Sequence, residues 1–157
     1  MIEVKEVLPE ELKQVRFNVL WPFLNSAEEA NIDIDNSEGA IHLAGIVEGQ
    51  IVGCASLFIQ NCDRYPTMFQ NQKIYRLRAM GVLESVQGMG VGAEIIHKSE
   101  QICRDCGFEV IWCDARELAW GFYSKLGFVY ACSDDGYECD AYEVRNVGLH
   151  KMMYKSL

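Results

Sequence analysis

The alternation of apolar and polar residues predicts short elements along the first part of the chain. Residues 2–7 (IEVKEV) alternate as a half-buried strand does. Pro9 suits the first turn of a helix, and Pro22 should end that helix. The polar, acidic segment 25–39 predicts a loop with room for one helical turn.

Two apolar runs then flank a turn. Residues 40–47 and 51–59 lie on either side of Glu48, Gly49 and Gln50. Strand-like runs separated by such a short, glycine-containing segment predict a β-hairpin.

The remaining elements alternate between strands and helices. Apolar residues recur at roughly helical spacing after the glycine-rich stretch VQGMGVG, and Gly107 suits the end of that helix. The expected elements are a central strand at 73–83, a helix at 90–106, a buried strand at 108–115, a helix at 116–126, and strands at 128–133 and 148–157. This order predicts a single mixed α/β domain over residues 1–157.

The composition limits the classes of function. The formal net charge is -9 and 24% of the residues are charged, which argues against the basic face that nucleic-acid binding requires. No apolar run approaches the ~20 residues that cross a bilayer. The N-terminal sequence has no basic segment followed by an apolar one, as a signal peptide would. We therefore expect a cytoplasmic protein that binds neither nucleic acid nor membrane.

Seven cysteines are scattered along the chain, and their odd number without a secretion signal is typical of reduced thiols. Cys103 and Cys106 form one CxxC pair. Without a second pair, this spacing is weak evidence for zinc. We expect a structural role for the pair and no metal.

Three glycines at the start of a predicted helix need a physical reason, because glycine is a poor helix former. Glycine allows close approach of a phosphate, and a helix N-terminus offers free N–H groups. A P-loop requires Gly-Lys-Ser/Thr, but Ala93 follows Gly92 here. The Gly-x-Gly-x-Gly spacing, late in the chain, also fits a dinucleotide fold poorly. A simple tight turn remains the structural alternative.

The stretch 87–92 (QGMGVG) resembles the Gln/Arg-x-x-Gly-x-Gly/Ala signature of the GCN5-related N-acetyltransferase (GNAT) superfamily. Residues 119–128 (AWGFYSKLGF) resemble its second hallmark, Ala-x-x-Phe-Tyr-x-x-x-Gly-Phe. The two motifs stand in the family's order and spacing. The resemblance implies a GNAT fold, which is a mixed, mostly antiparallel central sheet of six to seven strands, flanked by helices and splayed between strands four and five.

The resemblance implies that acetyl-coenzyme A is the co-substrate. Its pyrophosphate would lie on the N–H groups of the glycine stretch, and its pantetheine arm would pair with the preceding strand like an added strand. Glu84 stands where many family members have proline, and its charge would weaken phosphate binding modestly. The implied cofactor-binding residues are Met80, Gly81, Val82, Gln87, Gly88, Met89, Gly90, Val91 and Gly92.

The resemblance also implies a mechanism. Family members transfer acetyl by direct attack of an amine, so no cysteine nucleophile is expected. Tyr123 matches the family tyrosine that protonates the departing thiolate, and its alternative role is packing on the sheet. Asp114 ends a predicted strand, on the same side as Val110 and Trp112. It would take the amine proton directly or through water, cap the next helix, or do both.

The acceptor is the least defined part of the prediction. Arg78 and His150, polar residues in apolar elements, are candidates for the acceptor pocket, whereas Arg16 and Arg76 suit surface or sheet-edge positions. Acidic residues before the last strand would attract a cationic amine or form a solvated turn, and we favour the turn. They are Asp134, Asp135, Glu138, Asp140 and Glu143.

The sequence therefore predicts an acetyl-coenzyme A dependent N-acetyltransferase. Its acceptor would be a primary amine on a small molecule, an amino acid or a peptide N-terminus. The alternative is a non-catalytic acyl-coenzyme A binding or regulatory module on the same fold, which could dispense with Tyr123 and Asp114. The sequence leaves both a monomer and a homodimer open.

Overall fold

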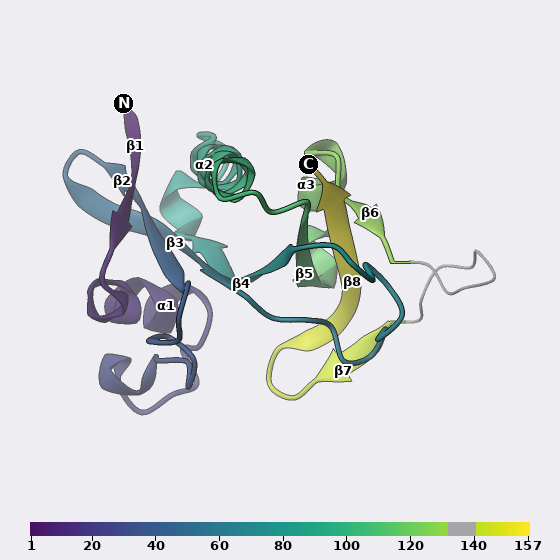
Figure 1. The fold of residues 1–157 in the computed structure, drawn as a ribbon. Helices are drawn as coiled ribbons and strands as arrows, with labels where there is room; N and C mark the ends of the chain where they lie inside the picture. The colour runs from purple at the N-terminus through teal and green to yellow at the C-terminus, as the bar shows by residue number, and fades with distance from the viewer. Residues whose placement is uncertain (132–140) are drawn as a thin grey trace. The chain divides into compact units, whose positions relative to one another are not determined.

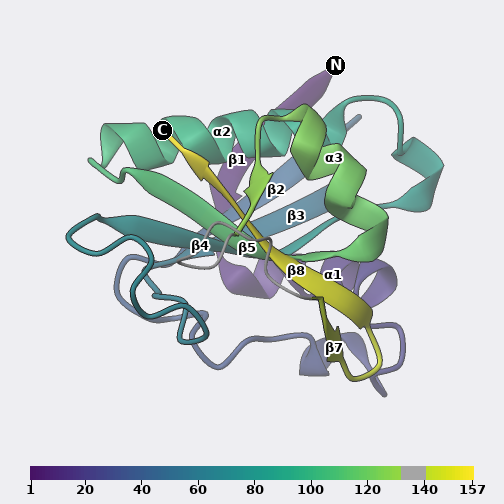
Figure 2. The same ribbon diagram turned by 90° about the vertical axis from the view of Figure 1, so that its right-hand side faces the viewer.

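A computed structural model describes residues 1–131 and 141–157 of the chain (Figures 1 and 2). Strands, α-helices and short 3-10 helices (η) follow one another in mixed order. The elements are β1 (Ile2–Val7), η1 (Pro9–Leu12), α1 (Lys13–Val19), η2 (Ala27–Glu29), β2 (Ile41–Val47), β3 (Gln50–Phe58), β4 (Ile74–Val82), η3 (Glu84–Val86), α2 (Val91–Asp105), β5 (Val110–Arg116), η4 (Glu117–Ala119), α3 (Trp120–Lys125), β6 (Val129–Tyr130), β7 (Tyr142–Val144) and β8 (Gly148–Ser156). Within the described ranges, every helix is too short or too polar to cross a bilayer.

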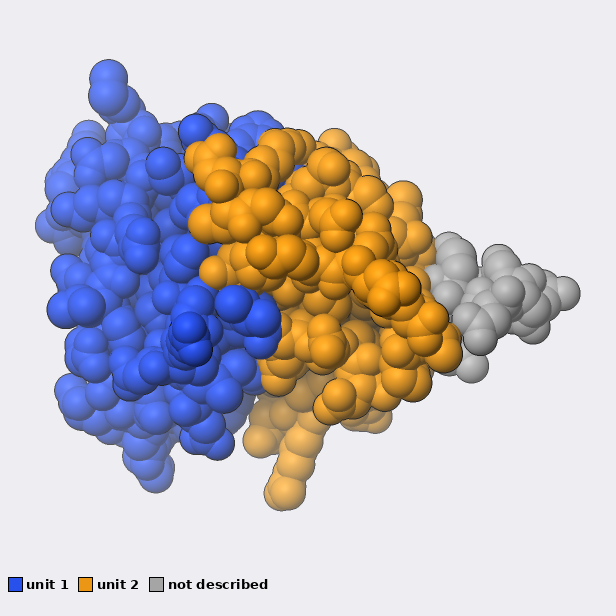
Figure 3. All heavy atoms as spheres, viewed as in Figure 1, with its two compact units in different colours: residues 1–59, 77–102 blue, residues 60–76, 103–157 orange. Residues whose placement is uncertain are grey.

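The chain forms two compact units (Figure 3). The first unit contains residues 1–59 and 77–102, and the second contains residues 60–76 and 103–157. The strand order is β1-β2-β3-β4-β5-β8-β6, with β7 also paired to β8. β4 contributes to both units, because its first residues, 74–76, count with the second and the others with the first.

The predicted hairpin in the first unit is confirmed. β2 and β3 pair antiparallel, with Val47 opposite Gln50 next to the turn. The turn residues Glu48 and Gly49 have φ angles of 51° and 76°. Two successive positive φ angles are the conformation of a type I′ turn, which matches the twist of the strands that it joins.

A pair of glycines lets α2 lie close to β2 and β3. Gly45 is directly opposite Gly53. A Cβ atom on Gly45 would lie 2.8 Å from Val91 Cγ1 and 2.9 Å from Ile95 Cδ1. One on Gly53 would lie 3.0 Å from Ile95 Cδ1. Because Val91 and Ile95 are buried, the two glycines form the seat on which the first turns of α2 pack.

The opposite face of β2 and β3 packs against α1, and Figures 1 and 2 show the two helices on either side of these strands. Successive residues of a strand point to opposite faces. Ala44 and Cys54, the neighbours of the two glycines, therefore face α1. They share a buried apolar cluster with Leu12, Val15 and Leu20. Removal of this surface from water holds α1 against the strands.

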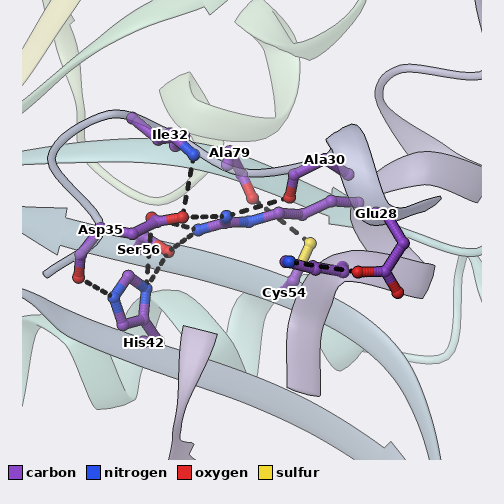
Figure 4. Close-up of polar contacts among 10 residues, drawn as sticks. Glu28, Ala30, Ile32, Asp35, His42, Cys54, Ser56 and Ala79 are labelled. Atoms are coloured by element: carbon purple, nitrogen blue, oxygen red, sulfur yellow. Dashed lines mark hydrogen bonds and ion pairs between the residues drawn. The ribbon is translucent and has the colours of Figure 1, made fainter. Parts of the chain in front are cut away.

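Arg16 is fully buried, so the expectation of a surface or sheet-edge position is wrong. Its guanidinium donates to both carboxylate oxygens of Asp35, at 2.7 and 2.9 Å, and to Ser56 Oγ at 2.9 Å. His42 joins the network through Ser56 Oγ, at 2.7 Å, and the Asp35 carbonyl oxygen, at 2.8 Å (Figure 4). Burial alone would raise the pKa of Asp35, but the Arg16 hydrogen bonds help to bring it below its ordinary value. The ion pair ties the segment 25–39 to α1.

The second unit is built around β5 and β8. β8 pairs antiparallel with β5, β6 and β7, and the start of β4 runs parallel to β5. Val110 and Trp112 of β5 point into one buried cluster, whereas Cys113 points to the other face, toward α3. The cluster consists of Cys62, Ile74, Val110, Trp112, Ala131 and Met152.

The predicted fold class is confirmed as mixed α/β with a mostly antiparallel sheet. The described strands number eight, one more than the prediction allowed. The extra strand is β7, whose three residues are too few to show alternation in the sequence. Of the acidic residues before the last strand, Glu143 lies exposed in β7. The others, Asp134, Asp135, Glu138 and Asp140, lie outside the described residues.

Gly45→Ala should destabilise the protein, because the new methyl group would meet two side chains of α2 at 2.8 and 2.9 Å. Overpacking a core costs ~1–3 kcal/mol, so urea titration should show a free energy of unfolding lower by that amount. Gly121→Ala is the control, because a Cβ there meets nothing within 4 Å and alanine favours a helix by ~1 kcal/mol. Equal effects of the two substitutions would contradict the glycine seat.

Candidate active site

The glycine-rich stretch forms a loop between η3 and α2, within the first unit. Gly88 and Gly90 have φ angles of 86° and 94°, in the left-handed region that other residues rarely adopt. A Cβ on Gly88 would meet nothing within 4 Å, and one on Gly90 would meet only Ile2 Cδ1, at 3.9 Å. The backbone conformation therefore requires glycine at these two positions, whereas side-chain packing does not. The space beside both glycines is open. Glu84 begins η3 just before the loop and is exposed.

The helix after the loop offers N–H groups to a ligand. α2 begins at Val91, and the first N–H groups of a helix have no partner within it. Gln87 and Met89 differ, because they donate their N–H groups to carbonyls of the η3 turn at 3.2 and 3.3 Å. The best placed donors for an anion are therefore the N–H groups of the glycines and of the first turn of α2.

β4, the strand before the loop, is irregular at Ala79. The φ angle of Ala79 is 51°, which interrupts the extended backbone. The Ala79 carbonyl accepts a hydrogen bond from the buried Cys54 thiol at 3.3 Å, and the Gly81 N–H also faces that thiol. N–H groups alternate in direction along a strand. Those of Met80 and Val82 consequently point away from β3.

Gly81 also has a structural role. A Cβ on Gly81 would lie 2.7 Å from Val19 Cγ1 and 2.9 Å from Leu20 Cδ2. The absence of a side chain at Gly81 therefore lets the end of α1 pack directly on β4. The Gln87 side chain holds the other end of this segment, because its amide nitrogen donates to the Val82 carbonyl at 3.1 Å.

Tyr123 lies on α3 in the second unit and is buried. Its hydroxyl is in hydrogen-bond contact with the Cys113 thiol of β5. Its ring packs against those of Phe122 and Phe128, with centroids 5.2 Å apart in both pairs. Burial raises the pKa of Tyr123 well above its ordinary value, and the nearby Cys113 adds to the shift. The hydroxyl therefore keeps its proton.

Both carboxylate oxygens of Asp114 accept hydrogen bonds from arginines. Oδ1 accepts from Arg64, and Oδ2 accepts from Arg76 Nη2 at 2.7 Å. Tyr142 is also in hydrogen-bond contact with this carboxylate. The capping alternative for Asp114 is wrong, because the next helix starts from Arg116 without a side-chain cap. The surface or sheet-edge position expected for Arg76 is also wrong, because Arg76 lies on an inner strand with its side chain 19% exposed.

Asp114 and Tyr123 lie on opposite faces of β5. Cys113, which contacts Tyr123, directly precedes Asp114, and successive side chains of a strand point in opposite directions. Asp114 shares its face with Trp112, and the Arg76 guanidinium lies over the Trp112 ring at 4.7 Å. Strand alternation predicted this side for Asp114 correctly. Because they lie on opposite faces of β5, the two predicted catalytic residues, Asp114 and Tyr123, do not come together.

The two acceptor-pocket candidates fall in different units. Arg78 is half-buried in the part of β4 that belongs to the first unit. His150 is buried on β8 in the second unit, where its Nδ1 atom lies 2.9 Å from the Gly148 carbonyl oxygen. Its ring centroid lies 5.9 Å from that of Tyr142. His150 therefore neighbours the group around Asp114.

Three buried cysteines are suited to packing and not to nucleophilic attack. Burial raises the pKa of Cys54 to about 12, and it raises the pKa of Cys62 and of Cys113. Thiols that stay protonated are poor nucleophiles. Of the CxxC pair, Cys103 is buried, whereas Cys106 is exposed. Cys132 and Cys139 lie outside the described residues.

Sequence reasoning missed Arg64 and Tyr142. Arg64 is 50 residues from Asp114 in the chain, in a connection with few apolar residues. Tyr142 belongs to the short strand β7, which was predicted as a loop. Neither residue lies in a motif, so only the folded chain shows that both contact Asp114.

The comparison with protein families gives a match to the Acetyltransferase (GNAT) family over residues 7–128. The matched range includes the glycine loop, Asp114 and Tyr123. An N-acetyltransferase of Bacillus subtilis (strain 168), YitI, which is described as uncharacterised, is 29% identical over 157 residues. The alignment covers 100% of this chain and 97% of that protein.

Solved structures share the fold. Escherichia coli ElaA has a TM-score of 0.71 at 17% identity, with 99% of both chains covered. An aminoglycoside 6'-N-acetyltransferase, solved in complex with coenzyme A, has a TM-score of 0.68 at 15% identity, with 98% of this chain and 96% of that chain covered. At such identities the likeness concerns the fold alone.

Proposed function

Because the chain belongs to the acetyltransferase (GNAT) family and is an acyltransferase, we propose that it transfers acetyl from acetyl-coenzyme A to a primary amine by direct attack. The acceptor would be a small amine, an amino acid or a peptide N-terminus. The observation that carries the proposal is the open glycine loop at the start of α2. Its two positive-φ glycines and the helix N-terminus suit a bound phosphate.

The residues of the first unit fit the phosphates and the pantetheine arm of acetyl-coenzyme A. The N–H groups of Gly88, Gly90 and the first turn of α2 would hold the pyrophosphate. The N–H groups of Met80 and Val82 point away from β3, as an added strand requires. Gln87 would act through its side chain, which holds the end of β4 at the Val82 carbonyl.

The chemistry follows from what acetyl transfer needs. Acetyl-coenzyme A supplies a thioester whose C–S bond breaks as the amine nitrogen bonds to the carbonyl carbon. The nitrogen must lose a proton, and the departing sulfur must gain one. N–H groups of β4 near Met80 and Val82 would polarise the carbonyl oxygen. The raised pKa values of the buried cysteines support a route without an acyl-enzyme.

We assign the proton donor role to Tyr123. Its hydroxyl keeps its proton because burial raises its pKa, and it already contacts the sulfur of Cys113. Because this hydroxyl already makes a hydrogen-bond contact with one sulfur atom, its surroundings are compatible with proton donation to the sulfur of the coenzyme. To act as the donor, this hydroxyl must exchange the Cys113 sulfur for the coenzyme's.

We keep Asp114 as the candidate base, with one condition. Its two oxygens are engaged by Arg64 and Arg76, so it must give up one of these partners or accept the amine proton through water. A carboxylate that only positions the two arginines is the competing role. The two roles predict different dependences of the rate on pH.

The competing function is a non-catalytic acyl-coenzyme A binding module. Such a module would use the glycine loop and would not need the hydroxyl of Tyr123. Release of coenzyme A in the presence of an amine distinguishes the two, because a binding module gives a melting shift without turnover.

Gly90→Glu should abolish the rise in melting temperature that acetyl-coenzyme A gives to the wild type, since the ligand stabilises only the folded state. The substitution places a side chain and a negative charge where phosphate would lie. Gly107→Glu is the matched control, because Gly107 also has a positive φ angle, 78°, and open space around it, but stands just beyond the C-terminal end of α2. A melting shift that survives in Gly90→Glu would reject the phosphate site.

Tyr123→Phe should lower kcat by ~10²-fold or more, the scale of losing a general acid, while the acetyl-coenzyme A melting shift stays the same. The substitution keeps the ring that packs on Phe122 and Phe128. Tyr154→Phe removes a hydroxyl from another ring of the same unit, one that packs on Phe69 at 4.9 Å, and serves as the control. Turnover at the wild-type rate in Tyr123→Phe would remove this tyrosine from the mechanism.

Asp114→Asn separates the base from the positioning role. If the carboxylate is the base, the rate should fall most at low pH, where the amine is protonated, and recover partly as the pH rises. If Asp114 only positions Arg64 and Arg76, the rate should fall by a similar factor at every pH. The measurement is kcat/KM across the range of pH in which the protein stays folded.

A further inference from the structure

Two arginines share one carboxylate in the second unit. Arg64 and Arg76 each donate to one oxygen of Asp114. Arg76 also donates from Nη1 to Gln60 Oε1 at 2.9 Å. Arg64 and Arg76 are called here the arginine pair. Tyr142 completes the group by its hydrogen-bond contact with Asp114.

The charges of this group do not balance. Two guanidinium groups face one carboxylate, and among the described residues Asp114 is the only acid in ion-pair contact with either arginine. Within the described residues the group therefore carries a net positive charge, in a chain whose formal net charge is -9. An unbalanced charge that is partly withdrawn from water is costly unless an anion completes it.

Both arginines of the pair are held in place, and Arg64 is reachable from solvent. The Arg64 guanidinium lies 4.1 Å from the ring centroid of Tyr142, and that of Arg76 lies 4.7 Å from the ring of Trp112. Stacking on a ring leaves the N–H groups at the edge of a guanidinium free to donate. The Arg64 side chain is 39% exposed, and its hydrogen bond to Asp114 uses only Nη2. Asp114 and Tyr142 thus fix the position of Arg64, and within the contacts of the described residues Arg64 keeps N–H donors for a ligand.

We propose that Arg64, the exposed member of the arginine pair, binds the carboxylate of the acceptor, so that the acceptor is an amino acid whose primary amine receives the acetyl group. This inference rests on the proposed function and narrows its acceptor. The single excess positive charge matches one carboxylate, and the planar fork of arginine matches the two oxygens of that group. A dianionic phosphate would leave a net negative charge in an already acidic protein.

The test compares each of a panel of free amino acids with its own carboxamide, which keeps the amine and loses the charge. Coenzyme A release gives kcat/KM for both members of a pair. The wild type should prefer the acid by about tenfold to a hundredfold, the range expected for a charge-assisted hydrogen bond. Arg64→Gln should erase this preference by raising KM for the acid far more than KM for its carboxamide, so that the ratio of the two kcat/KM values approaches one. Arg64→Lys, which keeps the charge and loses the fork, should retain part of it.

Arg145→Gln is the matched control, because it removes an exposed arginine of the same unit that lies outside the group. It should keep the preference for the acid. Equal use of acids and carboxamides, loss of both activities together in Arg64→Gln, or turnover only of amines without a carboxylate would overturn the inference. In each case a retained melting shift with acetyl-coenzyme A, together with turnover of any amine, would leave the proposed function standing. Absence of both would overturn the proposed function itself.

Discussion

The close contact of α2 with the glycine pair Gly45 and Gly53 fixes the position of the glycine loop. A side chain at either position would push Val91 and Ile95 away from the strands, and with them the first turn of the helix. The loop ends where Val91 enters this seat, so the direction of its N–H groups depends on how deeply the helix sits. Because protein interiors are packed at a density of ~0.74, there is no spare volume beneath α2 for an added side chain. The proposed ligand site, which is made of backbone atoms, thus depends on two glycines that would not touch the ligand.

The parts of the fold that could be predicted from the sequence are those with a local cause. Turn chemistry gave the hairpin, because Glu48 and Gly49 adopt the positive φ angles that the short connection demands. Apolar spacing with a terminal glycine gave α2. Arg16 was misjudged because an arginine inside an apolar helix has no local sign of its partners. Asp35 and Ser56, which accept hydrogen bonds from the two terminal nitrogens of the buried guanidinium, are 19 and 40 residues further along the chain.

The candidate site divides in the same way. The motif around 87–92 predicted a glycine loop at the start of a helix, which the structure has, and strand alternation placed Asp114 on the correct face of β5. Neither the motif nor the alternation predicted which side chains surround these residues. Asp114 looked like a helix cap because helical residues follow it, whereas the folded chain surrounds it with Arg64, Arg76 and Tyr142 from distant segments. Ion pairs between distant segments leave no periodic pattern in the sequence. The sequence therefore identifies a charged residue but not the residue that pairs with it.

The two groups of arginine and aspartate side chains differ in charge balance and in exposure. Arg16 meets Asp35 one to one, both oxygens are engaged, and the two side chains are 0% and 5% exposed. That pair is balanced and closed, so it fixes the fold and offers nothing to a ligand. Within the described part of the chain, the group around Asp114 has two cations for one anion, and Arg64 faces solvent. Charge balance and exposure, more than the presence of an ion pair, indicate which charged groups are available for recognition. Both criteria support the proposal that the Asp114 group binds the acceptor.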